Sequence, residues 1–340
     1  MITSATTAGT TMQAIIQENY GEAENVLRLG QTGRPTIGDR EVLLRVHAAG
    51  VDRGVWHLVA GLPHAVRLAG YGIRAPKTPV PGREVAGRIE AVGGDVTLAV
   101  GDEVFGIAEG SFAEYARARA GKLAPKPSNL TFAQAAAVPV SGLTALQAVR
   151  DRGHVQAGQQ VLVIGASGGV GTFAVQIAKA YGADVTGVCS TAKADVVKSI
   201  GADRVVDYTR EDIADGGRRY DVILDTGGNR PLRQLRRALT PRGTLVIIGG
   251  ETDGRWLGGS DRQLRAVMLS PFTSQHLSTL LCSENQADLI ALTEMIESGQ
   301  VTPAIDKVYS LSETIAAIRY MRDGHARGKV VIDISDASHR

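Results

Sequence analysis

One stretch of the chain is the most informative about the fold: Val161-Leu-Val-Ile-Gly-Ala-Ser-Gly-Gly-Val-Gly171, which is followed by an apolar run from Thr172 to Ala180. The pattern predicts a buried strand, a tight turn and a helix, in that order. Glycine has no Cβ, so the backbone of such a turn can approach a pyrophosphate at the N-terminus of the helix. Glycine turns also serve helix–sheet packing, but this context favours dinucleotide binding. The residues expected to hold the cofactor here are Ser167, Gly168, Gly169 and Val170, in a motif of the form A-x-G-x-x-G.

Downstream of this motif, apolar strand patterns alternate with amphipathic helices. The predicted strands are Val161–Ile164, Val185–Val188, Arg204–Val206, Val222–Leu224, Thr244–Ile248 and Ala266–Leu269. Such alternation predicts right-handed βαβ units and a buried parallel sheet, with ligands at the carboxyl ends of the strands. The sixth strand would be an apolar sheet edge, and pairing with its copy in a second subunit predicts a homodimer.

Both ends of the chain show a different pattern, with short strands and glycine turns. The predicted strands of the first third are Met12–Ile16, Glu41–Val51, Glu84–Val92, Glu103–Ile107 and Ser111–Ala116. Their alternation predicts a mostly antiparallel, barrel-like region. After the parallel sheet, a helix at 286–298, a strand at 307–309, a helix at 312–323 and a strand at 329–334 fit a return to the first domain. We therefore expect one domain from residues 1–138 and 273–340, with a loose tail at 1–11, and a second domain from residues 139–272.

Composition excludes several classes of protein. The 340 residues are 44% hydrophobic, 21% charged and 4% aromatic, with a net charge of +2. These values exclude disorder and coiled coil as the overall class and argue against nucleic-acid binding. Cys189 and Cys282 cannot form a disulfide framework, and the tail lacks the features of a signal peptide. Since the uncharged runs contain proline and glycine clusters, we expect no integral membrane segment and a cytoplasmic location.

The choice of dinucleotide is made after the second strand of the parallel sheet, where the chain reads Cys189-Ser-Thr191. No carboxylate stands there to repel a 2′-phosphate, while Ser190, Lys193 and Tyr208 offer a hydroxyl, a cation and a further donor. This favours NADPH, although Lys193 could instead solvate the next helix. Near the nicotinamide half, Thr226, Gly249 and Gly250 leave backbone room for the cofactor or simply form turns.

The chain resembles the medium-chain dehydrogenase/reductase superfamily, and within it the zinc-free quinone oxidoreductases related to zeta-crystallin. The resemblance spans nearly all of 12–334 and is carried by Ala49–Asp52, Pro81–Gly87, Gly101–Gly106, Ser111–Tyr115, Ala137–Ala145, Gly165–Gly171 and Gly328–Val331. It implies an α/β fold with a GroES-like, partly open β-barrel made from both chain ends. A Rossmann domain, with its doubly wound parallel sheet, is inserted into this barrel, and the active site lies in the cleft between them.

The resemblance also implies where a catalytic zinc would bind in related alcohol dehydrogenases. The matching positions hold Asp52, Arg83 and Val140 here, and an arginine opposes a divalent cation. We therefore expect no metal. Without a Lewis acid, the acceptor must carry its own electrophilicity, which points to quinones and α,β-unsaturated carbonyls as substrates.

Further site residues follow from the same resemblance. His57 stands where relatives carry a cleft tyrosine or a proton-relay histidine, and a packed or exposed histidine is the alternative. Asp52 replaces a common asparagine near the nicotinamide, and Thr144 matches a threonine there or bonds its own helix. Tyr71 belongs to an inserted stretch, 62–78, that either shapes the substrate entrance or is a surface loop. We also place Phe272 at the cofactor.

These observations predict a zinc-independent, NADPH-dependent reductase of quinones or enones that works as a homodimer. Two alternatives stay open. One is a reductase of another activated carbonyl, and the other is an NADPH-binding sensor or structural protein with little turnover.

Overall fold

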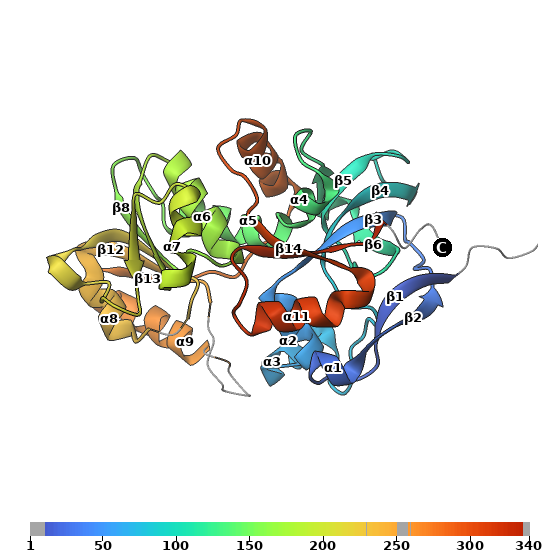
Figure 1. Ribbon diagram of the computed structural model, residues 1–340, viewed down its shortest axis with the longest axis horizontal. Helices are drawn as coiled ribbons and strands as arrows, with labels where there is room; N and C mark the ends of the chain where they lie inside the picture. The colour runs from blue at the N-terminus through green and yellow to red at the C-terminus, as the bar shows by residue number, and fades with distance from the viewer. Residues whose placement is uncertain (1–10, 229, 250–257, 259, 336–340) are drawn as a thin grey trace, which may run out of the picture.

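The computed structural model describes residues 11–228, 230–249, 258 and 260–335, and its two lobes lie side by side (Figure 1). The expected tail lies outside the described residues except for Thr11, which begins the first strand. One lobe is built around a parallel sheet and the other around an antiparallel barrel-like sheet. The predicted α/β fold class is therefore confirmed.

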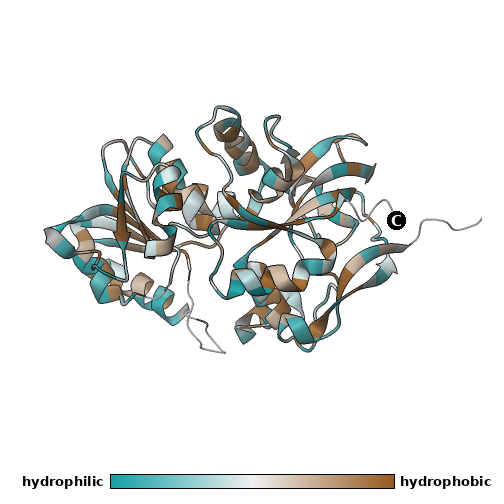
Figure 2. Cartoon of the chain, viewed as in Figure 1, coloured by the Kyte–Doolittle hydropathy of each residue, from teal (hydrophilic) through white to brown (hydrophobic). Residues whose placement is uncertain are grey.

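The parallel sheet has six strands in the order β10-β9-β8-β11-β12-β13. Their bounds are β8 Gln160–Ile164, β9 Asp184–Cys189, β10 Arg204–Asp207, β11 Tyr220–Asp225, β12 Leu239–Ile247 and β13 His276–Thr279. Figure 2 shows these strands as mainly hydrophobic, as a sheet covered on both faces requires. Alternate residues of β8 divide between two buried clusters: Val161 packs with Phe173 of α6, and Leu162 packs with Leu235 of α8.

The sixth strand is not where the sequence pattern placed it. Residues 266–269 form the last turns of helix α9, Ser260–Leu269, and the strand is β13. Ala266 is fully buried against the sheet, so its apolar neighbourhood belongs to the packed face of a helix. Because β13 lies beyond residue 272, we propose that the return to the first domain begins after Thr279.

The second lobe contains the barrel. A seven-stranded sheet runs β14-β15-β3-β4-β5-β7, with β6 paired to β3, and a separate hairpin joins β1 to β2. The bounds are β1 Thr11–Gln17, β2 Leu27–Gly33, β3 Glu41–Val51, β4 Glu84–Val92, β5 Glu103–Ile107, β6 Tyr115–Arg119, β7 Leu123–Pro125, β14 Ile305–Ser310 and β15 Lys329–Asp333. The last two strands come from the end of the chain, so this sheet is built from both ends of the chain.

Helices surround both sheets and lie at the junction of the lobes, where Figure 1 shows α5 and α10. Their bounds are α1 Ala23–Val26, α2 Arg53–Ala60, α3 His64–Val66, α4 Phe132–Ala136, α5 Pro139–Gln147, α6 Gly169–Ala180, α7 Ala194–Ser199, α8 Leu232–Ala238, α9 Ser260–Leu269, α10 Gln286–Glu297 and α11 Thr314–Arg322. One buried cluster runs from Phe105 of β5 to Phe173 of α6, so the two lobes share a core. Within the part of the chain that the structure describes, no helix has the length and hydrophobicity to span a membrane.

Candidate active site

The turn after β8 has no room for a side chain at Gly165 or Gly171. Gly165 has a φ of 77°, and a Cβ there would lie 2.5 Å from Thr226 Oγ1. A Cβ on Gly171 would lie 2.1 Å from the carbonyl oxygen of Gly165. Helix α6 begins at Gly169, so its first N–H groups, which have no acceptor within the helix, lie beside this turn. These residues fit the pyrophosphate of a dinucleotide, which needs close backbone approach and N–H donors.

The residues expected at the adenosine end lie at neighbouring strand ends. Ser190 follows β9, and Tyr208 follows β10 with 56% of its surface exposed. Lys193 lies nearby, but its Nζ donates to the carbonyl oxygens of Gly324 and Ala326 at 2.7 and 2.8 Å. These acceptors follow α11 of the other lobe, so in this structure Lys193 connects the two lobes.

At the nicotinamide end, an ion pair joins two strand ends to a helix. Asp225, at the end of β11, is fully buried, and its Oδ2 accepts from Arg262 Nη1 of α9 at 2.7 Å. Arg262 also donates to the carbonyl oxygens of Arg230 and Gly249. Thr226 Oγ1 donates to the carbonyl oxygen of Ile164 at 2.7 Å. Sequence reasoning used Thr226 and Gly249 but missed Arg262, which holds their backbone in place.

Of the other expected cofactor residues, Gly250 lies outside the described residues, and Phe272 is not part of this arrangement. Phe272 is 85% exposed on a turn before β13, at the start of the strand, whereas the other residues follow strand carboxyl ends. Phe272 was expected at the cofactor because the sixth strand was predicted too early in the chain. The residues that follow the observed strand are Leu280 to Cys282, and they lie next to the end of β12.

Thr144 is buried in α5, and its Oγ1 donates to the carbonyl oxygen of Val140 at 2.7 Å, the helix-bonding alternative. Its hydroxyl also contacts Cys282. Burial raises the pKa of the Cys282 thiol, an effect that the contact with Thr144 opposes. Cys282 was not predicted as a site residue, and only the correct position of β13 brings it beside Thr144.

Asp52 caps helix α2, because its Oδ1 accepts from the backbone N–H of Val55 at 2.8 Å. The other oxygen, Oδ2, is buried and has no hydrogen-bond partner among the described residues. His57 lies one turn further along α2, and its Nδ1 bonds the carbonyl oxygen of Leu62 at 2.8 Å. Burial lowers the pKa of His57, partly offset by this hydrogen bond, so the neutral imidazole is favoured.

A cavity of about 500 Å³ opens in the barrel lobe. Tyr71 and residues 76–78 of the inserted stretch line it, together with Leu58, the neighbour of His57 in α2. Tyr71 ends a helical turn, Arg67–Tyr71, and the Tyr20 hydroxyl donates to its carbonyl oxygen at 3.0 Å. The inserted stretch therefore shapes this cavity, which has the size of a small-molecule site.

Arg83, one of the three zinc-matching positions, lies on the wall of this cavity. It forms an ion pair with Glu284, which Lys122 Nζ also contacts at 2.8 Å. Burial acts to lower the pKa of Arg83, but Glu284, Tyr71 and Asp52 together raise it above its ordinary value. A permanent cation at this position opposes a metal ion, and no group of three or more His, Cys, Asp or Glu side chains within the described ranges could hold one.

A second ion pair lies between this wall and the glycine turn. Lys329 Nζ and Glu84 Oε2 form a contact in which both side chains are almost completely buried. Burial raises the pKa of Glu84 to about 7, although Lys329 and the N–H of Val140 oppose the shift. Gly328, the neighbour of Lys329, forms a backbone bridge with Gly168 of the turn. The pair therefore joins the cofactor turn of one lobe to the cavity wall of the other.

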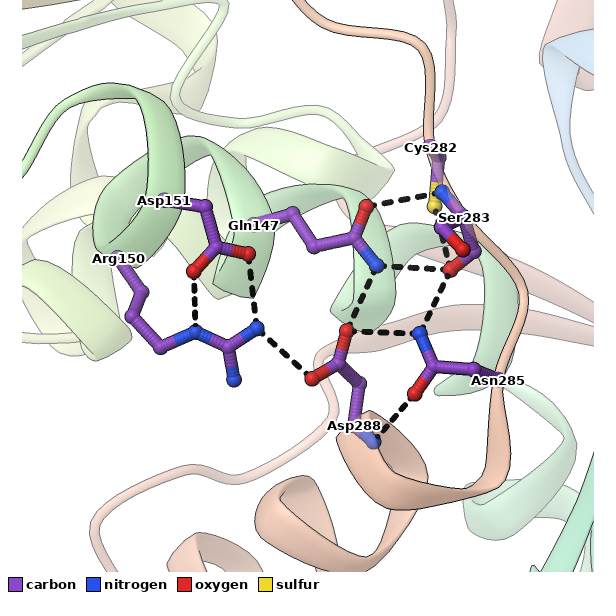
Figure 3. A network of polar contacts seen from close by, with 7 residues as sticks. All are labelled: Gln147, Arg150, Asp151, Cys282, Ser283, Asn285 and Asp288. Carbon is purple, nitrogen blue, oxygen red and sulfur yellow. Dashed lines mark hydrogen bonds and ion pairs between the residues drawn. The ribbon is translucent and has the colours of Figure 1, made fainter.

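A polar network holds the segment that carries Cys282 and Glu284 against α5 (Figure 3). Gln147 of α5 donates to the Ser283 carbonyl oxygen at 2.7 Å and to Asp288 Oδ2 at 2.8 Å. Arg150 Nη2 donates to Asp288 Oδ1 at 2.8 Å, and Asn285 caps α10. Burial acts to raise the pKa of Asp288, but the donors Asn285, Arg150 and Gln147 lower it below its usual value.

Comparison with known proteins agrees with this architecture. Two family descriptions match the chain: "Alcohol dehydrogenase GroES-like domain" over residues 38–128 and "Zinc-binding dehydrogenase" over residues 200–332. The chloroplast envelope quinone oxidoreductase homolog of Arabidopsis thaliana is 31% identical over 343 residues, which span 96% of this chain and 99% of the relative. The NADPH-dependent alkenal/one oxidoreductase of the same plant is 31% identical and covers 94% of this chain and 79% of its own length.

Solved structures share the fold along the whole chain. The quinone oxidoreductase from Coxiella burnetii has a TM-score of 0.81 at 28% identity, covering 95% of this chain and 99% of its own. A mycobacterial protein complexed with NADPH has a TM-score of 0.79 at 26% identity, covering 95% and 100%. The chain therefore belongs to the medium-chain dehydrogenase/reductase superfamily, as a nicotinamide-dependent oxidoreductase related to the quinone oxidoreductases.

Proposed function

We propose that this enzyme transfers a hydride from NADPH to a quinone or an α,β-unsaturated carbonyl without a metal. One observation carries the proposal: the glycine turn and the cavity are joined through adjacent residues, Gly168 to Gly328 and Lys329 to Glu84, beside Arg83. The relatives named as quinone and alkenal/one oxidoreductases support the same acceptor classes.

NADPH is the cofactor of this proposal because Ser190, Lys193 and Tyr208 lie at the ends of β9 and β10 and position 190 holds no carboxylate. The Asp207 carboxylate at the end of β10 is already bonded to Thr191 and Thr209. Lys193 would exchange its carbonyl partners for the 2′-phosphate, since a charged acceptor binds an ammonium more strongly than a neutral one. At the other end, Thr226 and Gly249 would lie against the nicotinamide, and Leu281 and Cys282 would take the place expected for Phe272.

The nicotinamide supplies the hydride, and the protein positions and polarises the acceptor. The acceptor gains the hydride at carbon and takes one proton from solvent in the open cavity, at oxygen or at the neighbouring carbon, which balances a two-electron reduction. Arg83 donates hydrogen bonds toward the oxygen on which charge develops, in the position where related enzymes hold a zinc ligand. Tyr71 closes the outer side of the cavity. The Asp52 carboxylate favours the charged form of Arg83, because it raises the pKa of that guanidinium. His57 acts through its bond to Leu62, not as the proton donor.

The test is NADPH oxidation by chelator-treated protein with a benzoquinone, a naphthoquinone, an enone and a plain ketone. We expect turnover of the first three acceptors and none of the ketone. Arg83→Gln should lower kcat by about a hundredfold, the usual effect of removing one oxyanion donor. Turnover of the ketone that zinc restores would overturn the metal-free mechanism, and NADPH binding without any turnover would favour the sensor or structural alternative.

Dimer formation is also part of the proposal, now through β13, the observed edge of the parallel sheet. One outward group, the Leu277 N–H, already bonds Ser270 Oγ at 2.9 Å, so the edge is only partly available. Sedimentation velocity tests dimer formation, and a monomer at micromolar concentration would contradict it.

We also propose a cytoplasmic location, which cell fractionation tests. The test is needed because relatives carry chloroplast and mitochondrial names.

A further inference from the structure

The cavity in the barrel lobe has a strongly cationic wall. Two carboxylates, Glu41 and Glu109, line it against five cationic side chains. The five are Lys77, Arg83, Arg117, Arg119 and Lys122. Glu284 lies behind the wall and pairs with both Arg83 and Lys122, which leaves an excess of two positive charges.

The carboxylates near this wall already have partners. Glu109 Oε2 lies 2.6 Å from Arg117 Nη2, and Glu41 accepts the Gly38 N–H at 3.0 Å. Glu41 stands opposite Arg119 in the register of β3 and β6, yet no ion pair forms between them. Among the described residues, neither Lys77 nor Arg119 has a carboxylate within ion-pair distance.

Uncompensated charge on a concave surface has a physical consequence. Low-dielectric walls focus the field, so like charges gathered there repel one another and attract an anion from solution. Lys77 and Arg119 are exposed where they line the cavity, so salt screens them over about 8 Å at physiological ionic strength. The reaction of the proposed function itself needs one cation, Arg83, so the reaction does not account for Lys77 and Arg119.

We infer that the substrate carries an anionic group away from its reacting carbon, and that Lys77 and Arg119 bind this group. The inference rests on the proposed function and narrows its substrate class to quinones or enones with an acidic substituent. Both side chains can donate hydrogen bonds to the oxygens of a carboxylate or a phosphate. Substrates with these two substituents differ in the charge of the anionic group and in its distance from the reacting carbon. Arg83 serves the reacting oxygen at the inner side of the same wall.

The experiment compares acceptors that share one reacting group. An enone with a terminal carboxylate is measured beside the same enone with a terminal carboxamide, and crotonyl-coenzyme A beside a neutral crotonyl thioester. We expect kcat/KM to favour the anionic member by about tenfold at low salt, the lower end of electrostatic steering, and the preference to shrink as salt rises. Preference within the carboxylate pair alone, or within the thioester pair alone, assigns the site to that source.

Variants identify the residues. Lys77→Gln and Arg119→Gln should each lower the ratio of anionic to neutral kcat/KM several-fold, and the double variant should bring it near one. Arg242→Gln removes an exposed cation in the parallel-sheet lobe and should leave the ratio as in the native enzyme. Using the ratio cancels any difference in folded fraction between preparations.

Two failures can be told apart. Reduction of the neutral acceptors without any charge preference, or a preference that survives both substitutions, overturns the inference and keeps the proposed function. Absence of turnover with all four acceptors and also with the two quinones of the first test overturns the proposed function itself.

Discussion

The neutral imidazole of His57 has a single N–H, which donates a hydrogen bond to the carbonyl oxygen of Leu62. Leu62 O can only accept, so Nδ1 must be the donor and Nε2 carries no proton. Burial lowers the pKa of His57, which keeps the ring neutral through the physiological range. The histidine is therefore better suited to hold the Leu62 end of the inserted stretch than to protonate the acceptor.

Two substitutions separate these roles. His57→Asn can keep a donor near the position of Nδ1, whereas His57→Phe keeps a ring and loses the donor. If His57 holds the loop, the asparagine variant should lose less than about tenfold in kcat, and the phenylalanine variant should lose more. A general acid would cost about a hundredfold or more in both, so equal large losses would contradict the loop role. The measurement is kcat against pH for the three proteins.

At the scale of elements, the contact between α5 and α10 depends on one buried carboxylate. The Asp288 carboxylate accepts from Gln147, Arg150 and Asn285, and the Asp288 backbone N–H donates to Oδ1 of Asn285, which caps α10. This network, drawn in Figure 3, holds the segment that begins with Cys282 and Ser283. Cys282 of this segment contacts Thr144, and Glu284 pairs with Arg83. The geometry of the cleft therefore depends on a helix–helix clamp outside it.

Asp288→Asn should lower the free energy of unfolding by about 2 kcal/mol at neutral pH, the usual size for hydrogen bonds to a charged group. The folded pKa of Asp288 lies below its ordinary 3.8. Its stabilisation is therefore present above that value and disappears as pH falls through the folded pKa. Urea unfolding of both proteins should give curves that converge in acid.

Asp151→Asn is the matched control for this clamp. Asp151 pairs with the same Arg150, but its side chain is 44% exposed. Its loss should cost less than about 1 kcal/mol. If the difference between the native protein and Asp288→Asn stayed constant down to pH 2, ionisation of Asp288 would not be its cause.

At the scale of the whole molecule, polar contacts cross between the lobes around the proposed cleft. The Gly168–Gly328 bridge, Lys193 on two carbonyl oxygens, and Glu284 on Arg83 and Lys122 all join segments distant in sequence. Among these contacts, Lys193 alone uses a side chain that the sequence assigns to the cofactor, since Gly168 contributes only backbone. In the proposed function, cofactor binding and lobe contact would compete for this one ammonium group.

Lys193→Met should raise the Kd of NADPH by about tenfold or more, because a charge-assisted hydrogen bond is lost. The Kd of NADH should change far less, since it has no 2′-phosphate. Lys198→Met, in the following helix α7, is the control and should change neither value. Fluorescence titration measures the Kd values of NADPH and NADH for both variants. If Lys193→Met raised the two Kd values equally, Lys193 would be a lobe contact only.

Local patterns predicted most of the fold, and their errors have physical causes. Strand β3 matches the predicted Glu41–Val51, and β8 with its turn matches the predicted motif. The hairpin strand β2 was missed because its residues are mostly exposed and show weak alternation. Val267-Met-Leu269 could be read as a short strand or a helix segment, since a short apolar run does not distinguish the two.

The glycine turn and the alternation behind the parallel sheet depend on neighbouring residues alone, so the sequence is enough to predict them. Which charges meet depends instead on the tertiary structure. Glu84 is 245 positions from Lys329, and Arg83 is 201 from Glu284. Such pairs form when two lobes from distant parts of the chain pack together, and no local periodicity encodes that packing. The same packing turns Lys193 toward Gly324 and gathers the cations of the cavity wall.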